Sequence, residues 1–220
     1  MIRIGVLVSG SGSNLQTIMD ACASGLIDGT VAVVISNVPD AYALVRARKM
    51  SVPTVVVQHE AYPDRESFDE ALAGKLEEYQ VDLVTLAGFM RVLTPAFLRR
   101  FPGRIMNIHP ALLPSFPGLH VRQKAIDYGV RFSGCTVHFV DEGVDTGPII
   151  IQAVVPVYPD DTEEELNERI LRLEHRIYPM AIRLFAENRL VVEGRKVRVK
   201  GLEKDPAAFL VNPPIEGCTL

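Results

Sequence analysis

The feature that most constrains the fold is an alternation of short apolar runs with amphipathic stretches over the first half of this 220-residue chain. The apolar runs are rich in β-branched residues, which is typical of buried strands, and cover residues 2–8, 31–36, 54–57, 83–87 and 104–108. Between them, apolar residues recur at helical spacing over residues 13–23, 42–49, 65–79 and 96–100. This alternation predicts an α/β fold whose first half is doubly wound and Rossmann-like, with a mostly parallel sheet and helices on both faces.

The second half continues with fewer, longer elements. We expect a helix at 121–128, strands at 135–140 and 149–157, a long helix at 161–187 and a terminal hairpin at 189–199. Thr162, followed three residues later by Glu165, predicts a capping box at the start of the long helix. Because no repeat or linker interrupts the pattern, we expect one domain over residues 1–200 and a proline-rich tail over 201–220.

Composition narrows the class of protein. A net charge of −4 gives no support for binding nucleic acid or an acidic membrane, and the N-terminal apolar run is too short for a membrane span. Three cysteines are too few for a disulfide framework and indicate a reducing compartment. We therefore expect a cytoplasmic protein with no nucleic-acid or membrane partner. We also expect a monomer or homodimer that acts on small-molecule substrates.

A glycine loop follows the first strand. The sequence Gly10-Ser11-Gly12-Ser13-Asn14 stands before a helix, where backbone N–H groups and the helix dipole can bind a phosphate. The third glycine of the dinucleotide fingerprint is absent, and the second strand ends without a carboxylate for a ribose. A ligand with a single phosphate fits this loop better than NAD, and a tight turn without a ligand is the alternative.

A second polar segment begins at Asn107 and His109, where the strand at 104–108 ends. Three prolines in the next eight residues make the loop stiff, at the sheet edge where parallel sheets bind ligands. Further on, Asp145 lies in an Asp-Thr-Gly-Pro turn, where its charge could orient His109 and favour the protonated imidazole. Asp141 and Glu142 compete for any acidic role, and plain structural turns remain the alternative for both segments.

Other chemistries find less support. The five histidines show no paired metal-ligand spacing, and the cysteines add none, so we expect no metal. A Gly-x-Ser-x-Gly nucleophile elbow is absent, and no cysteine has an evident activating base. The sequence indicates acid–base and electrostatic catalysis.

Taken in order, these motifs resemble those of the folate-dependent formyltransferases. The resemblance rests on Asn107-Ile-His-Pro110, Leu-Leu-Pro114, Pro-Gly118 and Asp145-x-Gly-Pro148. Residues 9–16 (Ser-Gly-Ser-Gly-Ser-Asn-Leu-Gln) and 87–91 (Ala-Gly-Phe-Met-Arg) are most similar to the branch that formylates glycinamide ribonucleotide in purine synthesis. The likeness covers roughly residues 2 to 190 and implies the formyltransferase fold.

The resemblance implies transfer of a formyl group from the co-substrate 10-formyltetrahydrofolate to the primary amine of glycinamide ribonucleotide, without a metal or an acyl-enzyme. His109 would be the general acid, Asn107 would hydrogen-bond the developing oxyanion, and Asp145 would keep His109 charged and relay protons. These roles agree with the chemistry, because preorganised donors stabilise a tetrahedral oxyanion by about 3–4 kcal/mol each and the leaving nitrogen needs a proton.

The resemblance also implies two sets of binding residues. Gly12, Ser13 and Asn14 would bind the ribonucleotide phosphate, and Glu174 would meet the glycinamide end. Arg65 would reach the glutamate tail of the folate, and residues 111–131 could act as a mobile lid. The rest of the folate site would comprise Asn107 and two walls: Met90, Arg91, Val92 and Leu93 on one side, and Asp141, Glu142, Gly143, Val144 and Asp145 on the other.

Three alternatives stay open. A formyltetrahydrofolate hydrolase uses similar loops but lets water attack, and its relatives carry an extra N-terminal domain. The methionyl-tRNA formyltransferases share the Asn-x-His-Pro segment and add a C-terminal RNA-binding domain. A non-catalytic sensor of nucleotide phosphates would keep the fold, although it would have no need for Asn107, His109 and Asp145 together.

Overall fold

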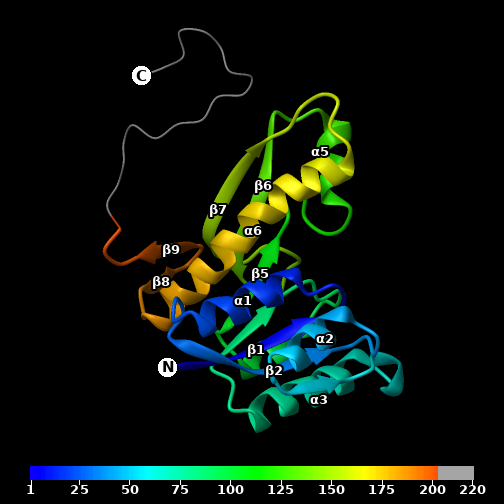
Figure 1. Cartoon of the computed structure of the whole chain (residues 1–220), viewed down its shortest axis with the longest axis vertical. Helices are drawn as coiled ribbons and strands as arrows, with labels where there is room; N and C mark the ends of the chain where they lie inside the picture. Colours follow the sequence, from blue (N-terminus) through cyan, green and yellow to red (C-terminus); the bar gives the residue numbers. More distant parts are fainter. Residues whose placement is uncertain (203–220) are drawn as a thin grey trace.

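The computed structural model describes residues 1–202, so the predicted tail lies almost wholly outside the described residues. One nine-stranded sheet forms its centre, in the order β3-β2-β1-β4-β5-β6-β7-β9-β8 (Figure 1). The strands are β1 (Ile2–Val8), β2 (Gly29–Ser36), β3 (Thr54–Val56), β4 (Leu83–Leu86), β5 (Ile105–His109), β6 (Phe132–Phe139), β7 (Ile149–Pro156), β8 (Leu190–Glu193) and β9 (Lys196–Val199). The helices are α1 (Ser13–Ala23), α2 (Tyr42–Lys49), the 3₁₀ turn η1 (His59–Ala61), α3 (Arg65–Glu78), α4 (Pro95–Arg100), α5 (Val121–Tyr128) and α6 (Glu163–Ala186).

The first half is a doubly wound parallel sheet, as predicted. Strands β3, β2, β1, β4 and β5 pair in parallel, and their side chains alternate between two cores. Val6 and Val34 belong to the core under α1, α2 and α6, whereas Leu7 and Ile35 belong to the core under α3 and α4. Apolar residues on both faces explain why these strands are nearly continuous hydrophobic runs.

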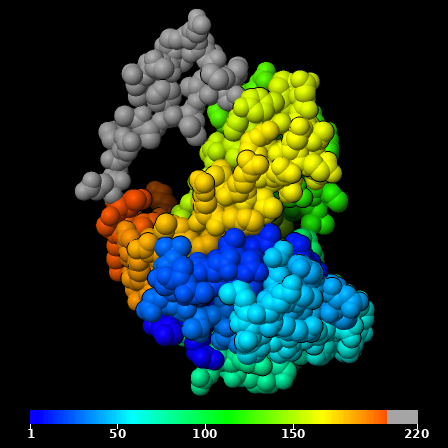
Figure 2. Space-filling model, in the orientation of Figure 1, coloured from blue at the N-terminus to red at the C-terminus, as the bar shows by residue number. Residues whose placement is uncertain are grey.

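The second half turns antiparallel. β6 pairs antiparallel with both β5 and β7, and the predicted terminal hairpin forms as β8 and β9. The long helix α6 begins with the predicted capping box and covers both halves, contacting β6, β7 and α1. Figure 2 shows its surface, yellow to orange, against the blue surface of α1. The parallel and antiparallel halves are therefore joined by one sheet and one helix.

Two predicted strand boundaries were wrong in an informative way. β5 continues one residue beyond its predicted end, so His109 as well as Asn107 lies within the strand. β6 begins at Phe132, three residues earlier than predicted, because Phe132 pairs with Pro156 of β7. In both places pairing with the neighbouring strand extends the ladder past the point where the local sequence pattern ends.

Within the described part of the chain, no helix has the length and apolar character that a membrane span requires.

The sheet order determines where a ligand can bind. β2 and β3 lie on one side of β1, and β4 and β5 lie on the other, so the order reverses between β1 and β4. The glycine loop after β1, the loop after β4 and the end of β5 therefore meet at one edge of the sheet. Crevices at such a reversal are the usual ligand sites of open α/β sheets.

Candidate active site

A cavity of about 580 Å³ opens at this edge of the sheet. Its walls come from the loop after β4, the end of β5, the segment before α5 and the turn between β6 and β7. Four residues of the predicted folate wall after β4 line it, namely Met90, Arg91, Val92 and Leu93. Four of the five residues predicted for the opposite wall also line it, namely Asp141, Gly143, Val144 and Asp145, whereas Glu142 is not among the lining residues.

Asn107 and His109 face this cavity together because they are two residues apart on a strand. Side chains at i and i+2 of a strand point to the same face, and Ile108 between them packs in the core under α1, α2 and α6. His109 is 5% exposed, so its imidazole is largely shielded from bulk water.

Asp145 connects the two side chains. Its Oδ2 lies 3.4 Å from His109 Nδ1 and accepts a 2.8 Å hydrogen bond from the Gly118 amide, while its Oδ1 lies 3.4 Å from Asn107 Nδ2 as acceptor. Asp145 adopts a left-handed backbone conformation with φ of 55°, which Asp and Asn tolerate better than other non-glycine residues. The structure thus brings the three predicted catalytic residues into one cluster.

His138 joins this cluster and was not among the predicted site residues. Its Nε2 lies 3.2 Å from Asn107 Nδ2 and 3.7 Å from Asp145 Oδ1, and its Nδ1 lies 2.8 Å from the Phe139 carbonyl. Because a carbonyl only accepts, Nδ1 carries a proton. The antiparallel register places His138 directly opposite Asn107. Its place in the predicted strand 135–140 was the only signal for it in the sequence.

Two acceptors surround the His109 ring. Nε2 lies 2.8 Å from the Phe116 carbonyl, and Nδ1 faces Asp145. Phe116 has a φ of 52°, an unusual conformation for a bulky residue, so the proline-rich loop is strained where it touches the imidazole. Both ring nitrogens therefore find their best partners when both carry protons.

Burial disfavours the protonated form of His109 more strongly than these two acceptors favour it. Burial lowers the pKa of His109, against the Phe116 carbonyl and the charge of Asp145, which both raise it. Asp145 therefore favours the protonated imidazole, as expected, but burial outweighs its contribution and the net shift of the His109 pKa is downward. Burial also raises the pKa of Asp145, but hydrogen bonds with His138 and Gly118 and the charge of His109 bring that pKa below its usual value.

The glycine loop has the geometry of an anion site. Gly12 has a φ of +72°, and a Cβ there would lie 2.6 Å from the Cβ of Ala43, so only glycine fits. Gly12 also caps α1 without any side-chain cap hydrogen bond, which leaves the first N–H groups of the helix, beginning at Ser13, available for a ligand. Arg46 of α2 donates a 2.9 Å hydrogen bond to the Ser11 carbonyl and adds positive charge beside the loop.

Asn14 and Glu174 meet although 160 residues separate them. Asn14 Nδ2 donates a 2.7 Å hydrogen bond to Glu174 Oε2, and both side chains are buried. Burial raises the pKa of Glu174, while Asn14 and the charge of Arg122, a residue lining the cavity, lower it. Asn14 Oδ1, and Nε2 of His175, the residue after Glu174, are buried and have no partner among the described residues.

Arg65 lies beside the cavity and not in its lining. Its Nη2 donates a 2.6 Å hydrogen bond to the carbonyl of Val92, on the loop that forms the cavity wall. In this conformation the guanidinium supports the wall.

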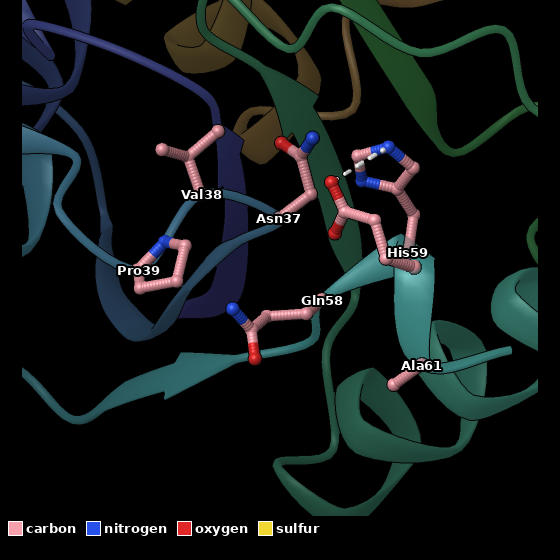
Figure 3. A pocket seen from close by; sticks show the side chains of 7 residues that line it. Asn37, Val38, Pro39, Gln58, His59 and Ala61 are labelled. Carbon is pink, nitrogen blue, oxygen red and sulfur yellow. Dashed lines mark ion pairs between the residues drawn. The ribbon is translucent and has the colours of Figure 1, made fainter.

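A second cavity, of about 430 Å³, lies beyond the ends of β2 and β3 (Figure 3). The loop after β2 and the segment around η1 line it, and His59 forms an ion pair with Glu60 at 3.3 Å. Nothing in the sequence pointed to this cavity.

Among residues 1–202, no group of three or more His, Cys, Asp or Glu side chains could hold a metal ion.

This chain is similar to known formyltransferases along most of its length. The Formyl transferase family matches residues 2–182. The phosphoribosylglycinamide formyltransferase of Haemophilus influenzae is 48% identical over 86% of this chain and 90% of its own length, and that of Escherichia coli is 43% identical over 94% and 98%. The trifunctional purine biosynthetic protein adenosine-3 of Drosophila melanogaster is 47% identical over 86% of this chain, which spans only 14% of that protein.

Solved structures agree. Glycinamide ribonucleotide transformylase 1 from Symbiobacterium toebii superposes with a TM-score of 0.90 at 60% identity, covering 90% of this chain and 94% of its own. The phosphoribosylglycinamide formyltransferase of Coxiella burnetii gives a TM-score of 0.86 at 41% identity, with 91% and 94% covered.

Proposed function

The chain belongs to the formyl transferase family, and from that premise we propose that it is an enzyme transferring the formyl group of 10-formyltetrahydrofolate to the amine of glycinamide ribonucleotide. One observation carries the proposal: Asn107, His109 and Asp145 line one cavity, and Asp145 contacts both of the others. The relatives that this chain covers almost completely are named phosphoribosylglycinamide formyltransferase. We place the reaction in the cytoplasm, in a monomer or homodimer, with no metal, nucleic-acid or membrane partner.

The reaction needs an oxyanion donor and a proton carrier. The amine attacks the formyl carbon, the carbonyl oxygen becomes an oxyanion, and the bond from carbon to the folate nitrogen breaks as that nitrogen takes a proton. Asn107 Nδ2 would donate to the oxyanion. Its hydrogen bond to Asp145 is long, at 3.4 Å, and therefore weak, so the amide can also donate to the substrate. His109 would give its proton to the departing nitrogen, and the His109–Asp145 pair would receive the proton that the amine loses.

The electrostatics of His109 suit a group that both gives and takes a proton. Burial favours release of the proton, whereas the Phe116 carbonyl and Asp145 favour its retention. Because the net shift of the His109 pKa is downward, the imidazole releases a proton more readily than an exposed histidine does. In the described geometry Nε2 is bonded to Phe116, so the strained loop must shift before this nitrogen can reach a substrate.

The two substrates would bind in different parts of the site. Gly12, Ser13 and Asn14 would bind the phosphate of the ribonucleotide at the start of α1, and Glu174 would accept hydrogen bonds from its glycinamide end. The pterin would lie between the walls of the larger cavity. Arg65 would reach the glutamate tail only by giving up its hydrogen bond to Val92.

The test follows consumption of 10-formyltetrahydrofolate by absorbance, with and without glycinamide ribonucleotide. Consumption that depends on the ribonucleotide, with formylated ribonucleotide as product, supports the transferase. Equal consumption without it identifies a hydrolase. Tight ribonucleotide binding without consumption identifies a sensor.

A further inference from the structure

The loop after β4 is exposed, yet it forms a wall of the larger cavity. Met90 is 65% exposed and Val92 is 53% exposed, so their side chains contribute little packing that could hold the loop. Gly88 at its start has a φ of +74°, a conformation that glycine adopts without steric strain. A wall of this kind can present backbone groups reproducibly only if other residues restrain its backbone.

Ser9, the residue directly after β1, provides that restraint at the start of the loop. Its backbone N–H donates a 3.0 Å hydrogen bond to the Gly88 carbonyl, and its Oγ accepts a 2.9 Å hydrogen bond from the Met90 N–H. These two contacts continue the pairing of β1 and β4 beyond the ends of the strands. They clamp the backbone on both sides of Phe89.

Asn37, which follows β2, orients the Ser9 hydroxyl. Ser9 Oγ donates to Asn37 Oδ1 at 2.6 Å, and because a hydroxyl has one proton, a lone pair then faces the Met90 N–H. Asn37 is only 6% exposed, and the neighbouring Ser36 hydroxyl holds its loop through hydrogen bonds with the backbone of Val38. Asn37, Val38 and Pro39 also line the second cavity, where Figure 3 shows their side chains.

The other end of the wall is held by α3. Arg65 donates to the Val92 carbonyl at 2.6 Å, and Asp69, which is 2% exposed, accepts from the Thr94 N–H at 2.6 Å. The loop between Gly88 and Thr94 is thus fixed at both ends by polar contacts to its backbone.

We propose that Ser9 and Asn37 are positioning residues for the folate: a hydrogen-bond relay from Asn37 through Ser9 to the Met90 amide holds the cavity wall in the conformation that the pterin requires. The inference rests on the proposed function, since it takes the larger cavity to be the folate site. Neither side chain lines that cavity, so neither is placed against the reacting atoms.

The test measures KM for each substrate, kcat, and the Kd of tetrahydrofolate by calorimetry. Ser9→Ala leaves the Met90 N–H without its acceptor, and we expect KM for 10-formyltetrahydrofolate and Kd for tetrahydrofolate to rise about tenfold, the equivalent of about 1.4 kcal/mol. KM for the ribonucleotide and kcat at saturation stay within about twofold. Asn37→Leu gives the same split, whereas Asn37→Asp keeps an acceptor oxygen for Ser9 and restores folate binding. Ser24→Ala, which removes a hydroxyl bonded to the Ala21 carbonyl at the far end of α1, is the matched control.

The double variant Ser9→Ala/Asn37→Leu decides whether the two act as one relay. A relay predicts that the double variant is no weaker than either single variant, whereas independent contacts multiply. Unchanged folate affinity in Ser9→Ala, an equal rise in both KM values, or multiplicative effects overturn the proposal, and Ser9→Ala decides alone if Asn37→Leu does not fold. If the wild type binds tetrahydrofolate but transfers no formyl group, the function fails and the calorimetry still judges the relay.

Discussion

Replacing Asp145 by Asn removes one charge from the centre of the site, together with the acceptor oxygen that faces Asn107 Nδ2. The left-handed backbone at position 145 suits Asn as well as Asp, and one amide oxygen can still accept from the Gly118 amide. What disappears is the attraction between the carboxylate and a protonated His109, whose Nδ1 lies 3.4 Å from Oδ2.

The distance sets the size of the effect. At 3.4 Å and an effective dielectric constant of about 20, two opposite unit charges attract by about 5 kcal/mol. The Asp145 side chain is 12% exposed, so water screens part of this, and we take about 3 kcal/mol as lost from the protonated state. Since each 1.36 kcal/mol is tenfold in rate, kcat falls by about two powers of ten.

The variant also changes the pH dependence. Burial already lowers the pKa of His109, and the charge of Asp145 opposes it, so Asp145→Asn lowers that pKa further. If the protonated imidazole is the acid, the limb of the pH–rate profile that reports His109 moves to lower pH, and the loss in kcat is larger at pH 8 than at pH 6.

The assay is ribonucleotide-dependent consumption of 10-formyltetrahydrofolate between pH 5.5 and 9, with binding of both substrates measured separately. Asp28→Asn is the control, because Asp28 pairs with the N-terminal amine on the surface, at the amino end of β2. A kcat within fivefold of wild type, or an unshifted profile, would refute the role given to Asp145.

Three further predictions concern the surroundings of the site. Glu174→Gln keeps an acceptor for Asn14 but removes a carboxylate whose pKa is raised by burial. The wild type loses stability as the pH rises above about 4.5 and this buried carboxyl ionises, whereas the Gln variant does not. We therefore expect the variant to have a higher Tm than wild type at pH 8 and a higher KM for the ribonucleotide. Tyr178→Phe removes the hydroxyl that lies 3.0 Å from the carbonyls of Leu86 and Met106, and urea unfolding should show a loss of about 1–2 kcal/mol. Prolonged dialysis against a metal chelator should leave the transfer rate unchanged, and a loss restored by a divalent cation would contradict metal-free catalysis.

Some properties of the site followed from local sequence. Alternation at Asn107 and His109 places both side chains on one face of a strand, whatever that strand pairs with. The glycine loop lies between β1 and α1 because β-branched residues precede it and helical spacing follows, and Thr162 with Glu165 forms the capping box that begins α6. These features depend on residues within one turn or one strand, so their causes are visible in a short window of the chain.

The tertiary structure decided what distant residues do to one another. His138 lies opposite Asn107 only because β6 runs antiparallel to β5, and Asn14 reaches Glu174 only because α6 crosses α1. The pKa of His109 depends on how many atoms surround the ring as well as on Asp145, and burial, a sum over neighbours from the whole fold, outweighed the one charge that the sequence indicated. Periodicity identifies the faces of strands and helices, but the order and direction of strands decide which faces meet.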